Sequence, residues 1–226
     1  MTNLSPTLAG RLLGLAIVLA GMLLVVGAPK AETVVHSFDA SQGRISYTDV
    51  GAGAIVVLVP GADAFDGEFR YVVPQLVDSG FRVVTLATPV TMEASGGSAR
   101  ASAVGADIVE LIRYLGQGPA YLAGSATTAG AVAWATAVAP EQVRGLMLLG
   151  PSVAETTQAP ASHARTLVLM GQSDPAFVAP KVEAEAVARR VNGKVQMVEK
   201  AGGLPHVDAP GMVGPAMIDF MDRLDS

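Results

Sequence analysis

The segment Tyr121–Pro151, YLAGSATTAGAVAWATAVAPEQVRGLMLLGP, is the strongest indication of the fold class, because its pattern predicts one complete unit of strand, helix and strand. The apolar runs Ala120–Gly124 and Gly145–Leu149 predict two buried strands, and Thr128–Ala139 between them predicts a helix. Two strands joined through a helix lie parallel in one sheet, with the helix packed on its face. The segment therefore predicts a parallel sheet covered by helices.

The same alternation continues on both sides of this segment. Ala54–Val59, AIVVLV, is a continuous apolar run, as expected for a strand buried on both faces. Thr33–Phe38 and Arg44–Val50 flank a turn-rich stretch and predict an antiparallel hairpin at a sheet edge. We therefore predict an α/β domain with a mainly parallel eight-stranded sheet and helices on both faces. The other expected strands are Phe81–Ala87, Thr166–Met170 and Lys194–Val198, and the other expected helices are Phe69–Ser79, Ala101–Leu115, Lys181–Val191 and Met212–Leu224.

The N-terminus carries a run of 17 residues without a charge, Leu12–Ala28, between Arg11 and Lys30. The run is longer than a usual signal-peptide core and slightly shorter than the roughly 20 residues that span a bilayer. We expect residues 1–31 to form one hydrophobic helix that remains as a membrane anchor. The alternative is a cleaved signal peptide, but cleavage after Ala31 would place Pro29 where a small residue is wanted.

Either alternative places residues 32–226 as one domain on the exported, periplasmic or extracellular side, because Arg11 favours the cytoplasmic side. If the N-terminal segment is cleaved, we expect a secreted protein. With an anchor, the membrane itself is a partner.

Composition excludes several classes of function. A formal charge of −5 offers no basic surface for nucleic acid. The absence of cysteine excludes a thiolate metal site and a cysteine nucleophile, and the three histidines are too far apart in sequence for a common metal motif. The pair Gly96-Gly97 lacks the spacing of a phosphate-binding loop, so we expect neither a metal nor a cofactor. The histidines are His36, His163 and His206.

Four segments in order resemble the α/β-hydrolase family, and they extend the resemblance from Arg44 to Leu224. They are VVLVPGADAFDGEFRYVVPQLVDSGFRVV from Val56, the segment quoted first, TLVLMGQSDP from Thr166, and AGGLPHVDAP from Ala201. The resemblance implies the family's fold. The lid that many relatives insert would fall in Pro151–Arg165, which is too short for one, so a cap-less protein with an open, shallow pocket is implied.

The family's chemistry needs a nucleophile on a strained strand-to-helix turn, a histidine that takes its proton, and a carboxylate that orients the histidine. The resemblance assigns the carboxylate to Asp174. It puts Ala126 at the nucleophile position and Gly203 at the histidine position. A methyl group and a hydrogen atom cannot do this work, so the resemblance implies a catalytically degenerate triad.

Neighbouring residues leave an alternative open. A shift of one residue would offer Ser125 or Thr127 as nucleophile, and His206 could serve as base with Asp174 if its loop folds differently. By position, the amides of Ala62 and Thr127 would be the donors of an oxyanion hole. The wider set of expected oxyanion or ligand-binding residues is Gly61, Ala62, Ala126, Thr127 and Gly203.

Three functions follow. The first is a degenerate hydrolase homologue at the membrane that binds a small molecule, an acyl ligand or a partner protein. The second is an active, atypical ester hydrolase, and the third is a structural subunit of a membrane complex. The first two differ in whether the hydroxyl of Ser125 or Thr127 reaches the ring of His206.

Overall fold

A computed structural model describes residues 34–41, 43–61, 67–87 and 97–226. Residues Thr33–Ser226 form one compact unit. The predicted N-terminal anchor, residues 1–31, lies outside the described residues. Within the described ranges, no helix has the length and hydrophobicity needed to cross a bilayer.

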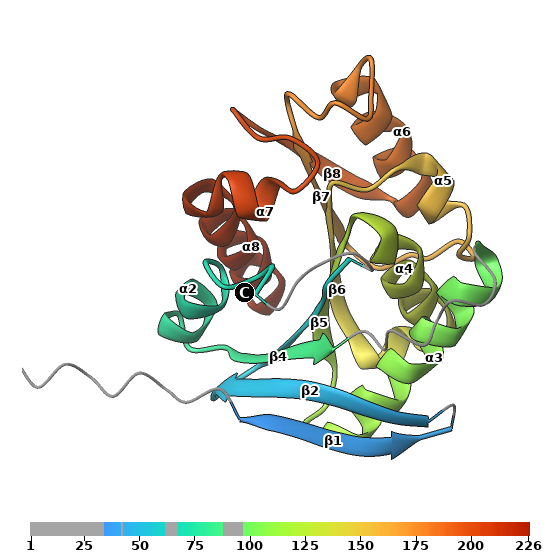
Figure 1. Cartoon of the computed structure of the whole chain (residues 1–226), viewed down its shortest axis with the longest axis vertical. Helices are drawn as coiled ribbons and strands as arrows, with labels where there is room; N and C mark the ends of the chain where they lie inside the picture. The colour runs from blue at the N-terminus through green and yellow to red at the C-terminus, as the bar shows by residue number, and fades with distance from the viewer. Residues whose placement is uncertain (1–33, 42, 62–66, 88–96) are drawn as a thin grey trace, which may run out of the picture. The chain divides into compact units, whose positions relative to one another are not determined.

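Eight strands of the described chain form one sheet in the order β1-β2-β4-β3-β5-β6-β7-β8 (Figure 1). The pairs β1–β2 and β2–β4 are antiparallel, and every other pair is parallel. This confirms the predicted α/β class, the mainly parallel sheet and the hairpin at its edge. The strands are β1 Val35–Ala40, β2 Gly43–Gly51, β3 Ile55–Val59, β4 Arg82–Ala87, β5 Ala120–Ser125, β6 Val143–Leu149, β7 Thr166–Gly171 and β8 Gly193–Val198.

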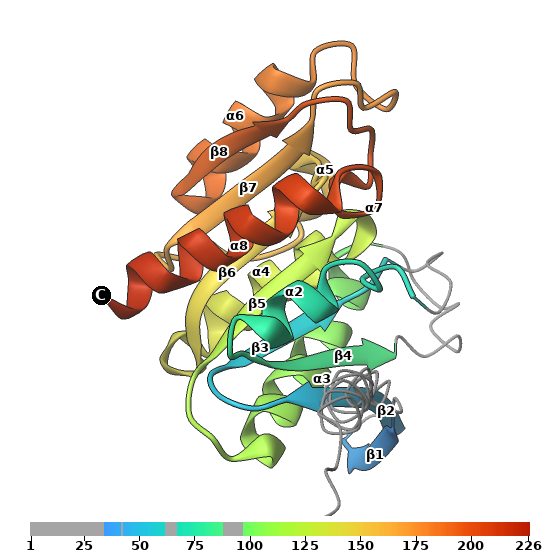
Figure 2. The same ribbon diagram turned by 90° about the vertical axis from the view of Figure 1, so that its left-hand side faces the viewer.

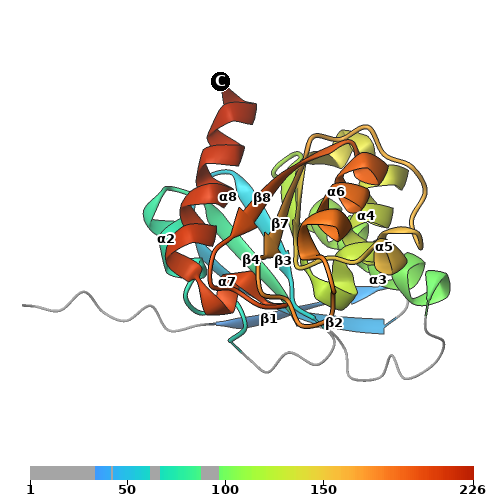
Figure 3. The ribbon, with the colours of Figure 1, turned by 90° about the horizontal axis from the view of Figure 1, so that it is seen from above.

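Helices cover both faces of the sheet, as Figures 1 and 3 show. One face carries α2 (Val73–Asp78), α7 (Pro205–Asp208) and α8 (Pro210–Asp225), and Figure 2 shows α8 lying across the strands beside α2. The opposite face carries the remaining helices. These are α3 (Ser98–Leu115), α4 (Ala129–Val138), α5 (Val153–Thr156) and α6 (Pro180–Val191).

Two apolar cores result, one on each side of the sheet. Every residue of β3 and β5 is buried, because both faces of these central strands are covered. Successive side chains point to opposite faces, so Val57 belongs to the core under α3 and α4, while Val56 and Leu58 belong to the core under α2 and α8.

The helix after β3 is shorter than its sequence pattern predicts. The apolar spacing indicated a helix from Phe69, but residues 67–72 form turns and α2 begins at Val73. Pro74 lies in the first turn of α2, where its missing N–H is not needed and its fixed φ favours a helix start.

The stretch between β6 and β7 contains only the one-turn helix α5, as expected for a chain without a lid in this region. Helix α6 holds this stretch in place. Glu183 Oε1 accepts a hydrogen bond from the amide of Val153 at 2.6 Å, and Arg190 donates to the carbonyls of Thr156 and Ala159 at 2.9 Å each. The connection is therefore tied to the sheet-covering layer.

Candidate functional site

The turn between β5 and α4 has a strained backbone at Ala126. Strand β5 ends at Ser125, and one 3₁₀ turn, Ala126–Thr128, leads into α4. Ala126 has a φ of 40°, in the left-handed region that residues with a Cβ rarely adopt. Such a conformation persists only where its surroundings fix it. Here Thr128 Oγ1 lies 3.0 Å from the Ser125 amide that donates to it and 2.8 Å from the carbonyl of Val59 on β3.

Tight packing of α4 on the strand also fixes this turn. A Cβ added at Gly124 would lie 2.4 Å from a methyl group of Val132, so a glycine is required two residues before Ala126. The turn therefore combines a close strand-to-helix approach with a left-handed residue at its tip. These are the backbone features that a nucleophile turn of the predicted family needs.

Asp174 lies beside Gly203, at the carboxyl end of β7. The carboxylate of Asp174 is buried, and its Oδ1 accepts a hydrogen bond from the amide of Ala176 at 2.9 Å. A Cβ added at Gly203 would lie 3.5 Å from each carboxylate oxygen of Asp174. A side chain at position 203 would therefore start next to this carboxylate. Gly150 packs so closely on the carbonyl of Gly203 that a Cβ there would approach it to 2.1 Å.

His206 forms no hydrogen bond with Asp174. Its ring, on α7, is fully buried and stacks on Phe69 with 4.7 Å between ring centroids. His206 Nε2 lies 2.6 Å from Oε1 of Glu68, while Nδ1 has no hydrogen-bond partner among the described residues. The ring therefore bonds neither to Asp174 nor to the hydroxyl of Ser125.

Glu68 is the residue of this site that sequence reasoning missed. Its side chain is 3% exposed, and its Oε2 accepts a hydrogen bond from the amide of Gly61 at 2.9 Å. Burial acts to raise the pKa of Glu68, but the hydrogen bonds to His206 and to the Gly61 amide, together with the proximity of the Ser125 hydroxyl, lower it below its usual value. The folded protein therefore favours the ionised form of this buried carboxyl group.

The sequence offered one weak signal for Glu68, which is its place seven residues beyond Gly61 within a segment that resembles the family. Only the fold reveals its partners, since Ser125 and His206 lie 57 and 138 residues further along the chain.

Ser125 is fully buried as well, and its Oγ makes no hydrogen bond of normal geometry within the described part of the chain. Its hydroxyl is nonetheless close enough to Glu68 to lower the pKa of that carboxyl. Ser125, Glu68 and His206 thus gather in one buried cluster. The resemblance implied an open pocket here, whereas Ser125 and His206 have no exposed surface.

The structure brings two of the expected oxyanion residues together. A Cβ added at Gly61 would lie 3.6 Å from Oγ1 of Thr127 and 3.8 Å from Oε2 of Glu68, so the ends of β3 and β5 meet at this point. Ala62, the other expected amide donor, lies outside the described residues.

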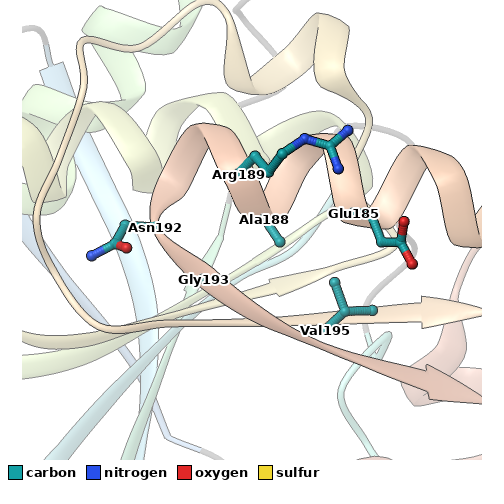
Figure 4. A pocket seen from close by; sticks show the side chains of 6 residues that line it. All are labelled: Glu185, Ala188, Arg189, Asn192, Gly193 and Val195. Atoms are coloured by element: carbon teal, nitrogen blue, oxygen red, sulfur yellow. The ribbon is translucent and has the colours of Figure 1, made fainter.

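Two surface grooves lie elsewhere and contain none of the expected site residues. The first, of about 290 Å³, lies between α6 and the start of β8, away from the carboxyl ends of the strands (Figure 4). The second lies between α3 and α4. Across the described residues, no group of three or more His, Asp or Glu side chains could hold a metal ion.

Comparisons with known proteins agree with this architecture. No family model and no curated protein matches the sequence. Among solved structures, a predicted CIB-like hydrolase from Thermoplasma acidophilum superposes with a TM-score of 0.71 at 17% identity, over 84% of this chain and 98% of that one. A thermophilic esterase from Thermogutta terrifontis superposes with a TM-score of 0.71 at 20% identity, over 87% and 100%.

A third similar structure is MGS-MChE2, an α/β-hydrolase enzyme from the metagenome of lagoon sediments at Mar Chica, Morocco. It has a TM-score of 0.70 at 16% identity and covers 84% of this chain and 100% of its own. At this level of identity the likeness concerns the fold. The domain described here has the α/β-hydrolase fold, as the sequence resemblance implied.

Proposed function

We propose that this protein is a catalytically degenerate α/β-hydrolase homologue, directed to the membrane by Leu12–Ala28, whose domain binds a small molecule, an acyl ligand or a partner protein. The observation that carries the proposal is the left-handed backbone of Ala126 at the tip of the β5–α4 turn. The family places its nucleophile on such a strained turn, and a methyl group there cannot attack a carbonyl carbon.

The surroundings of Asp174 support the same proposal. A side chain at Gly203 would start 3.5 Å from the Asp174 carboxylate, so the place for an oriented histidine is present without the imidazole. The nearest candidate to replace it, His206, is paired with Glu68 instead. A base that cannot reach the nucleophile's proton contributes little to acyl transfer.

An atypical ester hydrolase remains the second candidate. The cluster of Ser125, Glu68 and His206 favours it, because a hydroxyl, a carboxylate and an imidazole are the three groups that a nucleophilic relay uses. The degenerate reading is preferred because Ser125 and His206 are fully buried and are not hydrogen-bonded to each other.

Turnover of p-nitrophenyl acetate separates the two candidates. We expect the purified protein to hydrolyse the ester no faster than its Ser125→Ala, Thr127→Ala and His206→Ala variants, because no hydrogen bond joins the Ser125 hydroxyl to the ring of His206. Loss of a measurable rate in any one of these variants would contradict the degenerate assignment. Removal of a working triad member costs several orders of magnitude in kcat, so the difference would be unmistakable.

A further inference from the structure

Two donors hold the carboxylate of Glu68 at the carboxyl ends of β3 and β5, the edge of an α/β sheet where ligands bind. The amide of Gly61 donates to Oε2 at 2.9 Å, and Nε2 of His206 lies 2.6 Å from Oε1. Each oxygen therefore has its own donor, which is the two-point arrangement by which proteins recognise a carboxylate. The side chain of His206 is 0% exposed, so its bond to Glu68 is shielded from water.

Ser125 provides an independent observation at the same place. Its hydroxyl is buried close to Glu68, yet its Oγ has no hydrogen bond of normal geometry to any described residue. A buried polar group left unpaired destabilises the folded state, because it loses its hydrogen bonds to water without replacement. The described residues thus leave a buried polar group at this point without a hydrogen-bond partner.

We propose that Gly61 N–H, His206 Nε2 and Ser125 Oγ form a carboxylate-binding site, that Glu68 fills it as a built-in ligand, and that the external ligand of the domain carries a carboxylate that competes with Glu68. The inference rests on the proposed binding function and specifies its ligand class. Glu68 is tethered to the site, so its effective concentration reaches the millimolar range or higher. Small free carboxylates therefore compete poorly in the wild-type protein.

The test is the Glu68→Ala variant of the full chain in detergent, with acetate as the probe. Removal of the side chain leaves both donors without an acceptor. With about millimolar affinity, roughly 100 mM sodium acetate raises the melting midpoint of this variant by about 5–11 °C. Equal concentrations of sodium chloride and of neutral acetamide leave the midpoint within about 1 °C, because neither supplies a carboxylate.

Three matched proteins complete the experiment. The wild type and Glu68→Gln show no acetate-specific rise, since a side chain still fills the site. Glu183→Ala also removes a carboxylate that accepts a backbone hydrogen bond, from Val153 at 2.6 Å, but on α6. It melts lower than the wild type and does not respond to acetate.

The proposal is overturned if Glu68→Ala has the same melting midpoint in acetate and in chloride. It is also overturned if acetate raises the melting midpoint of Glu183→Ala by as much as that of Glu68→Ala. If Glu68→Ala is unfolded in chloride, acetate must restore its near-ultraviolet circular dichroism, and failure to do so also counts against the site. Ester turnover that depends on Ser125 would instead defeat the proposed function while leaving the acetate result intact, so the two failures are distinguishable.

Discussion

Ala126, Gly203 and Asp174 are the three residues on which the proposed function depends. Asp174 keeps its buried carboxylate, and the place beside it is taken by a glycine. At the other end of the predicted relay, a methyl group occupies the strained turn. Close packing at Gly124 and Gly150 fixes the backbone near Ala126 and Gly203. The backbone geometry of these two positions therefore does not depend on which side chain they carry.

The strain at Ala126 leads to a stability prediction. Because glycine adopts a positive φ without steric cost, Ala126→Gly should raise the free energy of unfolding by about 0.5–1 kcal/mol. The control is Ala133→Gly inside α4, which should lower it by about 1 kcal/mol. Urea unfolding measures both, and a destabilised Ala126→Gly would show that Ala126 is not strained.

Helix α3 carries a buried carboxyl group, Asp107, with an oxygen that no described residue hydrogen-bonds. Asp107 is buried on α3, and its Oδ1 has no hydrogen-bond partner in the described ranges. Burial, and to a lesser degree the nearby charge of Glu110, raises the pKa of Asp107 to about 6. The ordinary value is 3.8, so folding favours the protonated form of this carboxyl.

The upward shift of the Asp107 pKa determines how stability depends on pH. Because the folded state holds the proton more tightly, stability falls as pH rises from the unfolded value near 3.8 to the folded value of about 6, and is level above it. Asp107→Asn should remove this loss and stabilise the protein at pH 7.5 by about 1–3 kcal/mol.

Urea unfolding at pH 4.5 and 7.5 measures the effect. Glu110→Gln serves as control and should keep most of the pH dependence, because burial is the larger cause. If Asp107→Asn and the parent lose the same stability between the two pH values, Asp107 is not the group responsible.

The elements themselves were largely predictable. The runs that indicated strands correspond to β1 through β8 within one or two residues, because burial on both faces of a sheet demands continuous apolar sequence. The start of α2 was misplaced, since the apolar spacing of Phe69 and Val72 continues through turns that carry no separate signal. The single turns α5 and α7 were not predicted, because four residues are too few to show a helical period.

For the whole molecule, the sequence predicts attachment to the membrane through residues 1–31. If Leu12–Ala28 is an uncleaved anchor, the full-length protein should sediment with membranes through an alkaline carbonate wash, and a variant lacking residues 1–31 should not. Intact mass decides between the alternatives. A mature protein that begins at Glu32 and appears in the soluble exported fraction would establish a cleaved signal peptide instead.

The α/β class and the order of strands and helices along the chain could be predicted from the sequence, because apolar periodicity and turn residues are local properties of the chain. The resemblance to α/β hydrolases came from four segments of the sequence. It also indicated that a methyl group and a hydrogen atom stand where a nucleophile and a base are expected. The pairing of His206 with Glu68 rather than Asp174, and the burial of Ser125 beside them, became visible only in the folded chain. Those contacts join residues 57 to 138 positions apart, and no local pattern encodes which buried polar groups meet when the strand ends converge.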